Sequence, residues 1–177
     1  MPATPDDLLE GLAAGREEAF AALYDAYGAR LFAAACGMLG SREEAEDAVQ
    51  DVFVGLVQAR ARLRHIENLK AYLFASLRHA AMHRMGRAKT LQFGTAEVAM
   101  SAADSGPDAE ISRRLELALR RLPREQREVI AMHVDGGLTF AEVAAVLDLS
   151  ANTAASRYRY AMEKLREVMK ESQRGTV

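Results

Sequence analysis

Polar side chains of two kinds follow one another in a short segment of the last third of the chain. Asn152, Thr153 and Ser156 are small and can exchange hydrogen bonds with the edges of bases. Arg157 and Arg159 carry the guanidinium groups that bind guanine edges and backbone phosphates. At helical spacing such side chains line one end of a helix, so the segment predicts a helix that contacts duplex DNA.

The elements that would position this helix are marked by capping residues. Thr139 and Glu142 have the spacing of a capping box, which starts a short helix, and Ser150 stands where a second helix would begin. Two helices joined by a tight turn, with small residues at their crossing, are typical of a helix-turn-helix, here from Phe140 to Arg159. An ordinary helical hairpin is the alternative that these residues alone leave open.

Acidic residues gather on one face of a helix in the first third of the chain. Ser41 and Glu44 have capping-box spacing, and apolar residues recur every three or four positions after them. The opposite side of this helix carries a stripe that is available to water or to a basic partner: Glu43, Glu46, Asp47, Gln50 and Asp51.

The formal charge of the chain is only −2, but it is divided into blocks of opposite sign. Residues 1–60 hold 4 basic and 11 acidic side chains, 61–90 hold 7 and 1, 91–110 hold 0 and 4, and 111–177 hold 12 and 9. Two separate basic blocks in a nearly neutral chain are typical of two local contacts with a polyanion. A pair of solvated helix faces would explain the charges alone equally well.

Composition and periodicity predict an all-α fold of two small domains. Alanine contributes 34 residues, against 20 for Val, Ile and Thr together. Alanine favours helices, whereas β-branched residues favour strands. Helical periodicity lapses over 88–110, where turn and linker residues gather. We therefore expect a domain at 1–87, a flexible linker at 88–110 and a helix-turn-helix domain at 111–177.

Several classes of protein are not expected from this sequence. Cys36 is the single cysteine, so no disulfide can form within the chain, and the acidic amino terminus lacks the regions of a signal peptide. No apolar run approaches the roughly 20 residues needed to cross a bilayer. His79 and His83 share a helix face without a third ligand, which favours an exposed or DNA-facing pair over a metal site. We expect a cytoplasmic protein without cofactor, metal, enzymatic activity or membrane insertion.

Two segments carry motifs in a fixed order. Residues 45–53 read AEDAVQDVF, and residues 122–157 combine LP-x-x-x-REV, GLTF-x-EVA and T-x-x-SR. The first is similar to the polymerase-binding signature of bacterial RNA polymerase sigma factors, and the second resembles their region 4. With a linker between them, the two resemble the extracytoplasmic-function (ECF) class of sigma factor over residues 16–170.

This resemblance implies that each charged surface binds a different partner. The acidic stripe would bind core RNA polymerase through Asp47, Gln50 and Asp51, and Phe53 would pack that helix from behind. A basic loop over 60–68 and the helix after it would hold the opened −10 element of a promoter through Arg62, Arg64, Asn68, Lys70, Tyr72, His79, Arg84 and Arg87. The helix after Ser150 would read the duplex −35 element through Asn152, Thr153, Ser156, Arg157 and Arg159. An anti-sigma factor is a further partner that the family implies.

The chain departs from the family pattern at several of these positions. Tyr72 stands where the family usually has Trp, and His79 where it usually has Asn, so the resemblance does not carry over the base preference at −10. Tyr72 could support unstacked bases, whereas Phe74 at helical spacing is expected in the core. Tyr160 and Met162 replace arginines of the reading helix, which predicts fewer phosphate contacts and a weaker salt dependence.

Two other functions compete with this interpretation. A stand-alone helix-turn-helix regulator would use 1–90 for sensing or dimerisation and would bind DNA specifically without polymerase. A sigma mimic would sequester an anti-sigma factor without touching DNA, and it should lack basic promoter-facing residues. The basic block at 61–90, together with Arg157 and Arg159, argues against the mimic.

Overall fold

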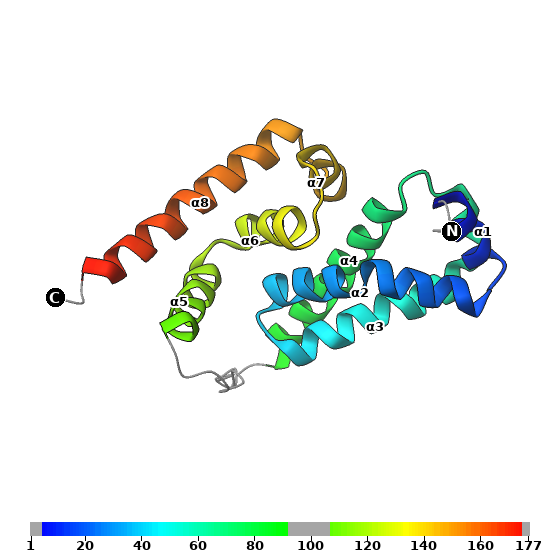
Figure 1. Ribbon diagram of the computed structural model, residues 1–177, viewed down its shortest axis with the longest axis horizontal. Coiled ribbons are helices and arrows are strands. Elements are labelled where there is room, and N and C mark those ends of the chain that lie inside the picture. The colour runs from blue at the N-terminus through cyan, green and yellow to red at the C-terminus, as the bar shows by residue number, and fades with distance from the viewer. Residues whose placement is uncertain (1–4, 92–106, 175–177) are drawn as a thin grey trace.

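The chain folds into helices throughout the residues that the structure describes (Figure 1). The computed structural model describes residues 5–91 and 107–174, with side chains described for 7–86 and 110–170. Within these ranges there are α-helices, a 3-10 helix and a π-helical turn, and no strand. The predicted all-α class is therefore confirmed.

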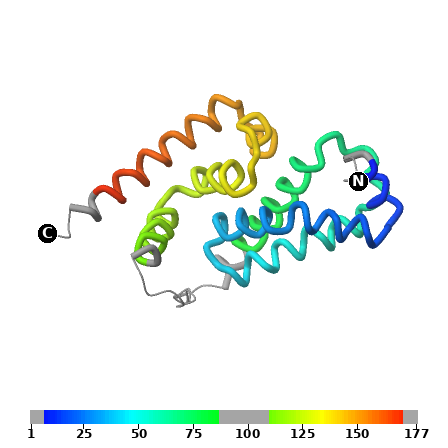
Figure 2. Tube along the Cα trace, viewed as in Figure 1, coloured from blue at the N-terminus to red at the C-terminus, as the bar shows by residue number. Residues whose placement is uncertain are grey.

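The N-terminal part is a helical bundle. Its elements are α1 (Pro5–Ala13), α2 (Glu17–Leu39), α3 (Arg42–Ala59), the 3-10 helix η1 (Arg60–His65) and α4 (Leu69–Leu91). Helices α2, α3 and α4 pack against one another, and α1 lies against η1 at one end (Figures 1 and 2). The tight α2–α3 turn is local in origin, because Gly40 takes a left-handed conformation (φ 68°) and the Ser41 hydroxyl accepts from the Glu44 N–H as predicted.

The C-terminal part contains the helix-turn-helix. Its elements are α5 (Pro107–Arg121), α6 (Arg124–Ile130), the π-helical turn η2 (Ala131–Asp135), α7 (Phe140–Leu147) and α8 (Ala151–Arg174). Thr139 and Glu142 form the complete capping box at the start of α7. Ser150 Oγ accepts from the Thr153 N–H at 3.0 Å and so caps α8.

Several expected element boundaries were wrong. The basic loop at 60–68 is largely a 3-10 helix, which the fully buried side chain of Leu63 anchors. The expected linker at 88–110 is helical at both ends, because α4 continues to Leu91 and α5 begins at Pro107, a residue that the first turn of a helix tolerates. Helix α6 ends at Ile130, and the chain continues directly into the π-helical turn η2. Helix α1 had no predicted counterpart.

The two parts share one hydrophobic core. Its larger cluster joins α2, α3 and α4 to the C-terminal part through buried residues such as Val129, Met132, Leu138 and Val143. A smaller cluster lies within the C-terminal part and consists of Ala118, Leu122, Ile130, Ala161 and Leu165. The N-terminal and C-terminal parts therefore pack against each other, a contact that the sequence did not indicate.

Candidate polymerase and nucleic-acid interfaces

The acidic stripe of α3 is exposed, as predicted. Asp47, Gln50 and Asp51 are all exposed, whereas Phe53 is half-buried and contacts Tyr24 of α2 with ring centroids 5.4 Å apart. Phe53 also lines an apolar groove of about 850 Å³ between α2 and α3, to which Phe20 contributes. The polar face and the groove adjoin, so a partner helix could meet charge and apolar surface together.

An arginine from α4 lies against this acidic stripe. Arg84 contacts Asp51 at 2.7 Å, Asp47 at 2.9 Å and Glu44 at 3.2 Å. Desolvation lowers the pKa of the Arg84 guanidinium, but the hydrogen bonds to Asp51 and Glu44 outweigh it and raise the pKa above its usual value. The resemblance assigns Arg84 to the −10 element, and in the structure its charge joins α4 to α3.

The remaining residues assigned to the −10 element lie on η1 and α4. Arg62, Arg64 and His79 are exposed, and Tyr72 is half-buried at the edge of the larger core. The side chain of Arg87 lies outside the described residues. The exposed cations of η1 leave a basic surface at the start of α4 that is accessible to a polyanion.

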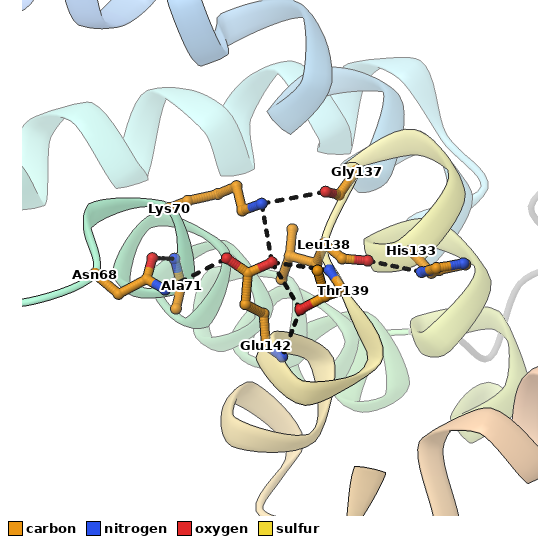
Figure 3. Close-up of polar contacts among 8 residues, drawn as sticks. All are labelled: Asn68, Lys70, Ala71, His133, Gly137, Leu138, Thr139 and Glu142. Carbon is orange, nitrogen blue, oxygen red and sulfur yellow. Dashed lines mark hydrogen bonds and ion pairs between the residues drawn. The ribbon is translucent and has the colours of Figure 1, made fainter. Parts of the chain in front are cut away.

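Two of the assigned residues are bound to the C-terminal part (Figure 3). Asn68 caps α4, since its Oδ1 accepts from the Ala71 N–H, and its Nδ2 donates to Glu142 Oε1 at 3.3 Å. Lys70 Nζ lies 2.9 Å from Glu142 Oε2 and donates to the Gly137 carbonyl at 3.2 Å. The capping glutamate of the helix-turn-helix therefore also joins α7 to α4.

The charge of Glu142 is strongly stabilised. Burial raises the pKa of its carboxyl, but the Lys70 ammonium, the Thr139 N–H and the Asn68 amide outweigh burial and lower the pKa to about 2. A group whose folded pKa lies below its unfolded pKa stabilises the fold above the unfolded value, near 4.5, and loses that contribution as pH falls through the folded value.

We therefore expect acid to weaken the α4–α7 contact. Between pH 5 and pH 2 the free energy of unfolding should fall by about 1–2 kcal/mol more in the wild type than in Glu142→Gln, allowing for solvent screening of the pair. Denaturant unfolding of both proteins across this range measures their free energies of unfolding. The other carboxyls titrate in both proteins, so their contribution cancels in the difference between the two. Parallel pH profiles of the two proteins would contradict the contact.

The reading helix α8 presents its first turns to solvent. Asn152, Thr153 and Arg159 are exposed, whereas Ser156 and Arg157 are half-buried. Arg157 pairs with Glu125 of α6 at 3.2 Å, a contact that leaves its guanidinium partly accessible. The five residues predicted to contact the −35 element thus lie together in the N-terminal part of α8. The N-terminal residues of a recognition helix are those that contact base edges in a major groove.

Aromatic packing fixes α8 against α7. The His133 ring stacks on Phe140 with centroids 4.1 Å apart, and Tyr158 meets the same imidazole edge-on at 5.0 Å. Asp148 takes a left-handed conformation (φ 55°) in the turn between α7 and α8, and Ala154 is fully buried at the crossing. These contacts give the two helices a fixed angle, which base readout requires.

Sequence reasoning missed the carboxylates that join the two parts. Glu128 is only 6% exposed, and it contacts Arg124 at 2.7 Å and Arg78 of α4 at 3.3 Å. The spacing to Arg124 is that of a helical i,i+4 pair and could have been noticed. Nothing local in the sequence indicates the pairs with Arg78, or those of Glu142 with Lys70 and Asn68.

In the described part of the chain, no three His, Cys, Asp or Glu side chains come together as a metal site, and His83 is exposed like His79. Burial raises the pKa of the half-buried Cys36 thiol, which disfavours its reactive thiolate. None of the described helices has the length and apolarity to cross a membrane.

Comparison with known proteins agrees with this geometry. Residues 23–90 match the family Sigma-70 region 2, and residues 112–165 match the family Sigma-70, region 4. The RNA polymerase sigma factor CnrH of Cupriavidus metallidurans is 31% identical, over 93% of this chain and 94% of CnrH. The ECF RNA polymerase sigma factor SigM of Mycobacterium tuberculosis is 26% identical, over 92% and 83%.

Solved structures show the same likeness across most of the chain. CnrH in complex with the cytosolic domain of CnrY superposes with a TM-score of 0.67 at 26% identity, over 94% of this chain and 97% of that one. RpoE of Bartonella quintana, solved with the anti-sigma factor NepR, gives a TM-score of 0.62 at 28% identity, over 79% and 89%.

A two-part helical chain with a region 2 bundle followed by a region 4 helix-turn-helix defines a sigma-70-type transcription factor. The chain belongs to the ECF class of RNA polymerase sigma factors. It is an alternative sigma factor that acts in transcription initiation, and its family is regulatory.

Proposed function

We propose that three separate surfaces carry the steps of initiation. The acidic stripe of α3, with Asp47, Gln50, Asp51 and the supporting Phe53, binds core RNA polymerase. The surface of η1 and α4 holds the opened −10 element, and the start of α8 reads the duplex −35 element. The observation that carries this proposal is the placement of exposed acidic groups on α3 and exposed basic or polar groups on η1 and α8.

The same proposal assigns the parts of the chain. Residues 1–87 act as the region 2-like domain, 111–177 as the region 4-like domain, and 88–110 as the linker. Within the −10 surface we assign phosphate contacts to Arg62, Arg64, Lys70 and Arg87, and base contacts or strand support to Asn68, Tyr72 and His79. We assign Arg84 to this DNA-binding surface only in a state in which its ion pairs with Asp47 and Asp51 are broken.

Partners and location follow from this role. Core polymerase and promoter DNA are the two obligatory partners, and both place the protein in the cytoplasm. The complex of RpoE with the anti-sigma factor NepR supports an anti-sigma partner for this chain as well. The chain itself performs no covalent chemistry in this scheme, because the polymerase supplies it.

Replacing Arg157 tests the −35 assignment. Arg157→Ala should weaken binding of the holoenzyme to −35 duplex DNA by about tenfold, because one arginine contact to a base edge contributes about 1–3 kcal/mol. Affinity for core polymerase should stay unchanged. Fluorescence anisotropy with a labelled promoter duplex and with labelled core measures the two affinities.

A matched control lies farther along the same helix. Arg166 is exposed on α8, about two turns beyond Arg159, so Arg166→Ala removes the same charge outside the assigned surface. It should change duplex binding by less than about twofold. Equal losses in the two variants would mean that only net charge matters, and equal loss of DNA and core binding in Arg157→Ala would mean general unfolding.

A further inference from the structure

The exposed side of α8 carries an aromatic ring beside its polar reading residues. Tyr160 is 52% exposed, whereas Ala154 and Ala161 are fully buried and mark the inward side of the helix. Since Tyr160 lies four residues after Ser156 and seven after Thr153, the three side chains project from the same side of α8. The ring therefore extends the surface that we assign to the −35 element.

This ring lies within the length of helix that a major groove accommodates. From Asn152 to Tyr160 the helix rises about 12 Å, at about 1.5 Å per residue, and a major groove is about 12 Å wide. About one turn farther on, the same side of α8 carries Glu163, an exposed acid that DNA phosphates would repel. The DNA-facing surface of α8 is therefore expected to end near Tyr160.

An adjacent arginine restricts the orientation of the ring. The guanidinium carbon of Arg159 lies over the Tyr160 ring, 5.2 Å from its centroid, which is within the range of a cation–π contact. Much of the ring remains exposed beside this contact. A side chain that is already restricted loses less conformational freedom on binding, so a contact between this ring and DNA carries a smaller entropic cost.

The chemistry of the ring selects its target. A tyrosine carries no positive charge, so it does not attract phosphates as an arginine at this position would. The carbon atoms of the ring gain from contact with apolar surface. Among the four bases, only thymine presents a methyl group in the major groove, at C5. Burial of this methyl group against the ring adds binding free energy that the other three bases do not supply.

We propose that Tyr160 reads a thymine of the −35 element through its C5-methyl group. The proposal rests on the −35 role proposed above for the start of α8. It adds a specificity-determining residue whose contact is apolar to a set of side chains that read bases by hydrogen bonds. Base preference at one position of the element then depends on the ring of Tyr160.

Selection from a duplex library locates the thymine. The holoenzyme is used to enrich duplexes built on a promoter that it transcribes, with the −35 element randomised. The wild type and Tyr160→Phe should both enrich thymine at one shared position, because both keep the ring. Tyr160→Ala should lose the preference at that position and keep the others. If the wild type enriches thymine at no position, the proposal is wrong.

Replacing the selected thymine by deoxyuridine removes only the methyl group. The wild-type holoenzyme should bind the deoxyuridine duplex about fourfold more weakly, the factor that corresponds to one buried methyl group. Tyr160→Phe should show the same loss, and Tyr160→Ala should show less than about 1.5-fold. Fluorescence anisotropy with the two labelled duplexes measures the ratio. If Tyr160→Ala is as sensitive to the methyl group as the wild type, a different residue contacts it and the proposal is overturned.

Control variants separate this inference from the −35 assignment itself. Arg166→Ala, exposed farther along α8, should keep both the thymine preference and the effect of the methyl group. Thermal unfolding of Tyr160→Ala should match that of the wild type, since alanine is favourable at an exposed helical position.

Comparison with the other reading residues shows which proposal fails. If Asn152→Ala or Arg157→Ala changes base preferences while Tyr160→Ala changes none, the thymine contact is wrong and the −35 role stands. If none of the three variants changes any preference, the −35 role fails together with the thymine contact.

Discussion

Reversing both charges of the α3 stripe, with Asp47→Lys and Asp51→Lys, is expected to weaken binding to core RNA polymerase by at least about a hundredfold. Loss of an interfacial charge pair costs about 2–5 kcal/mol, much of it from the charge left unpaired on the partner. The variant also places two ammonium groups beside Arg84, so repulsion there should destabilise the α3–α4 contact. Anisotropy with labelled core measures the affinity, and thermal unfolding measures the stability.

A double reversal on the other part of the chain provides the control. Glu163 and Glu167 are exposed on α8 with the same i,i+4 spacing, so changing both to Lys alters net charge by the same amount. This variant should bind core polymerase within about twofold of the wild type. A folded Asp47→Lys, Asp51→Lys protein that still copurifies with core would contradict the assignment of the stripe.

Truncating Phe74 is expected to have the largest effect on stability. The ring is fully buried on α4 and lies against the end of η2, where a Cβ added at Gly136 would come within 2.6 Å of it. Phe74→Ala should lower the free energy of unfolding by about 3–5 kcal/mol, since it leaves a cavity where the two parts share their core. Chemical denaturation monitored by circular dichroism measures the change.

The choice of replacement separates packing from base stacking. Phe74→Leu keeps most of the apolar volume and should cost about 1–2 kcal/mol, with little effect on promoter opening. If instead Phe74→Ala left stability within about 1 kcal/mol of the wild type but impaired opening, the ring would act as a stacking platform for bases and not as core.

Structural features that depend on residues close together in the sequence were predicted correctly. Ser41, Thr139 and Ser150 all cap helices as expected, because a cap joins a side chain to a backbone N–H only two or three positions away. The helix-turn-helix followed from two of these caps. The exposed side of α3 followed from the three- and four-residue spacing of its buried face.

Contacts between distant segments could not be predicted in the same way. Arg84 pairs with Asp47 across 37 positions, Arg78 with Glu128 across 50, and Asn68 with Glu142 across 74. In the sequence these arginines resemble other basic residues of a DNA-facing helix. Only the packing of α4 against α3, α6 and α7 determines which cations face solvent and which face carboxylates.

The packing of the N-terminal part against the C-terminal part could not be predicted from the sequence, for a related reason. Gly37 and Gly136 mark close approaches between segments, but a glycine in a sequence does not show what lies opposite it. The apolar face of α6 and α7 is buried. Its burial against α2 and α4, as well as within its own domain, depends on the tertiary arrangement.

Run-off transcription with purified core polymerase tests the central claim most directly, that this chain directs the polymerase to promoters through an acidic polymerase-binding face and two separate DNA-binding surfaces. Templates from a genomic promoter library should yield discrete transcripts only when the chain is present. The reversal at Asp47 and Asp51 and the Arg157→Ala variant should each reduce them at matched concentrations. No transcript from any template, with a folded chain and active core, would contradict the claim.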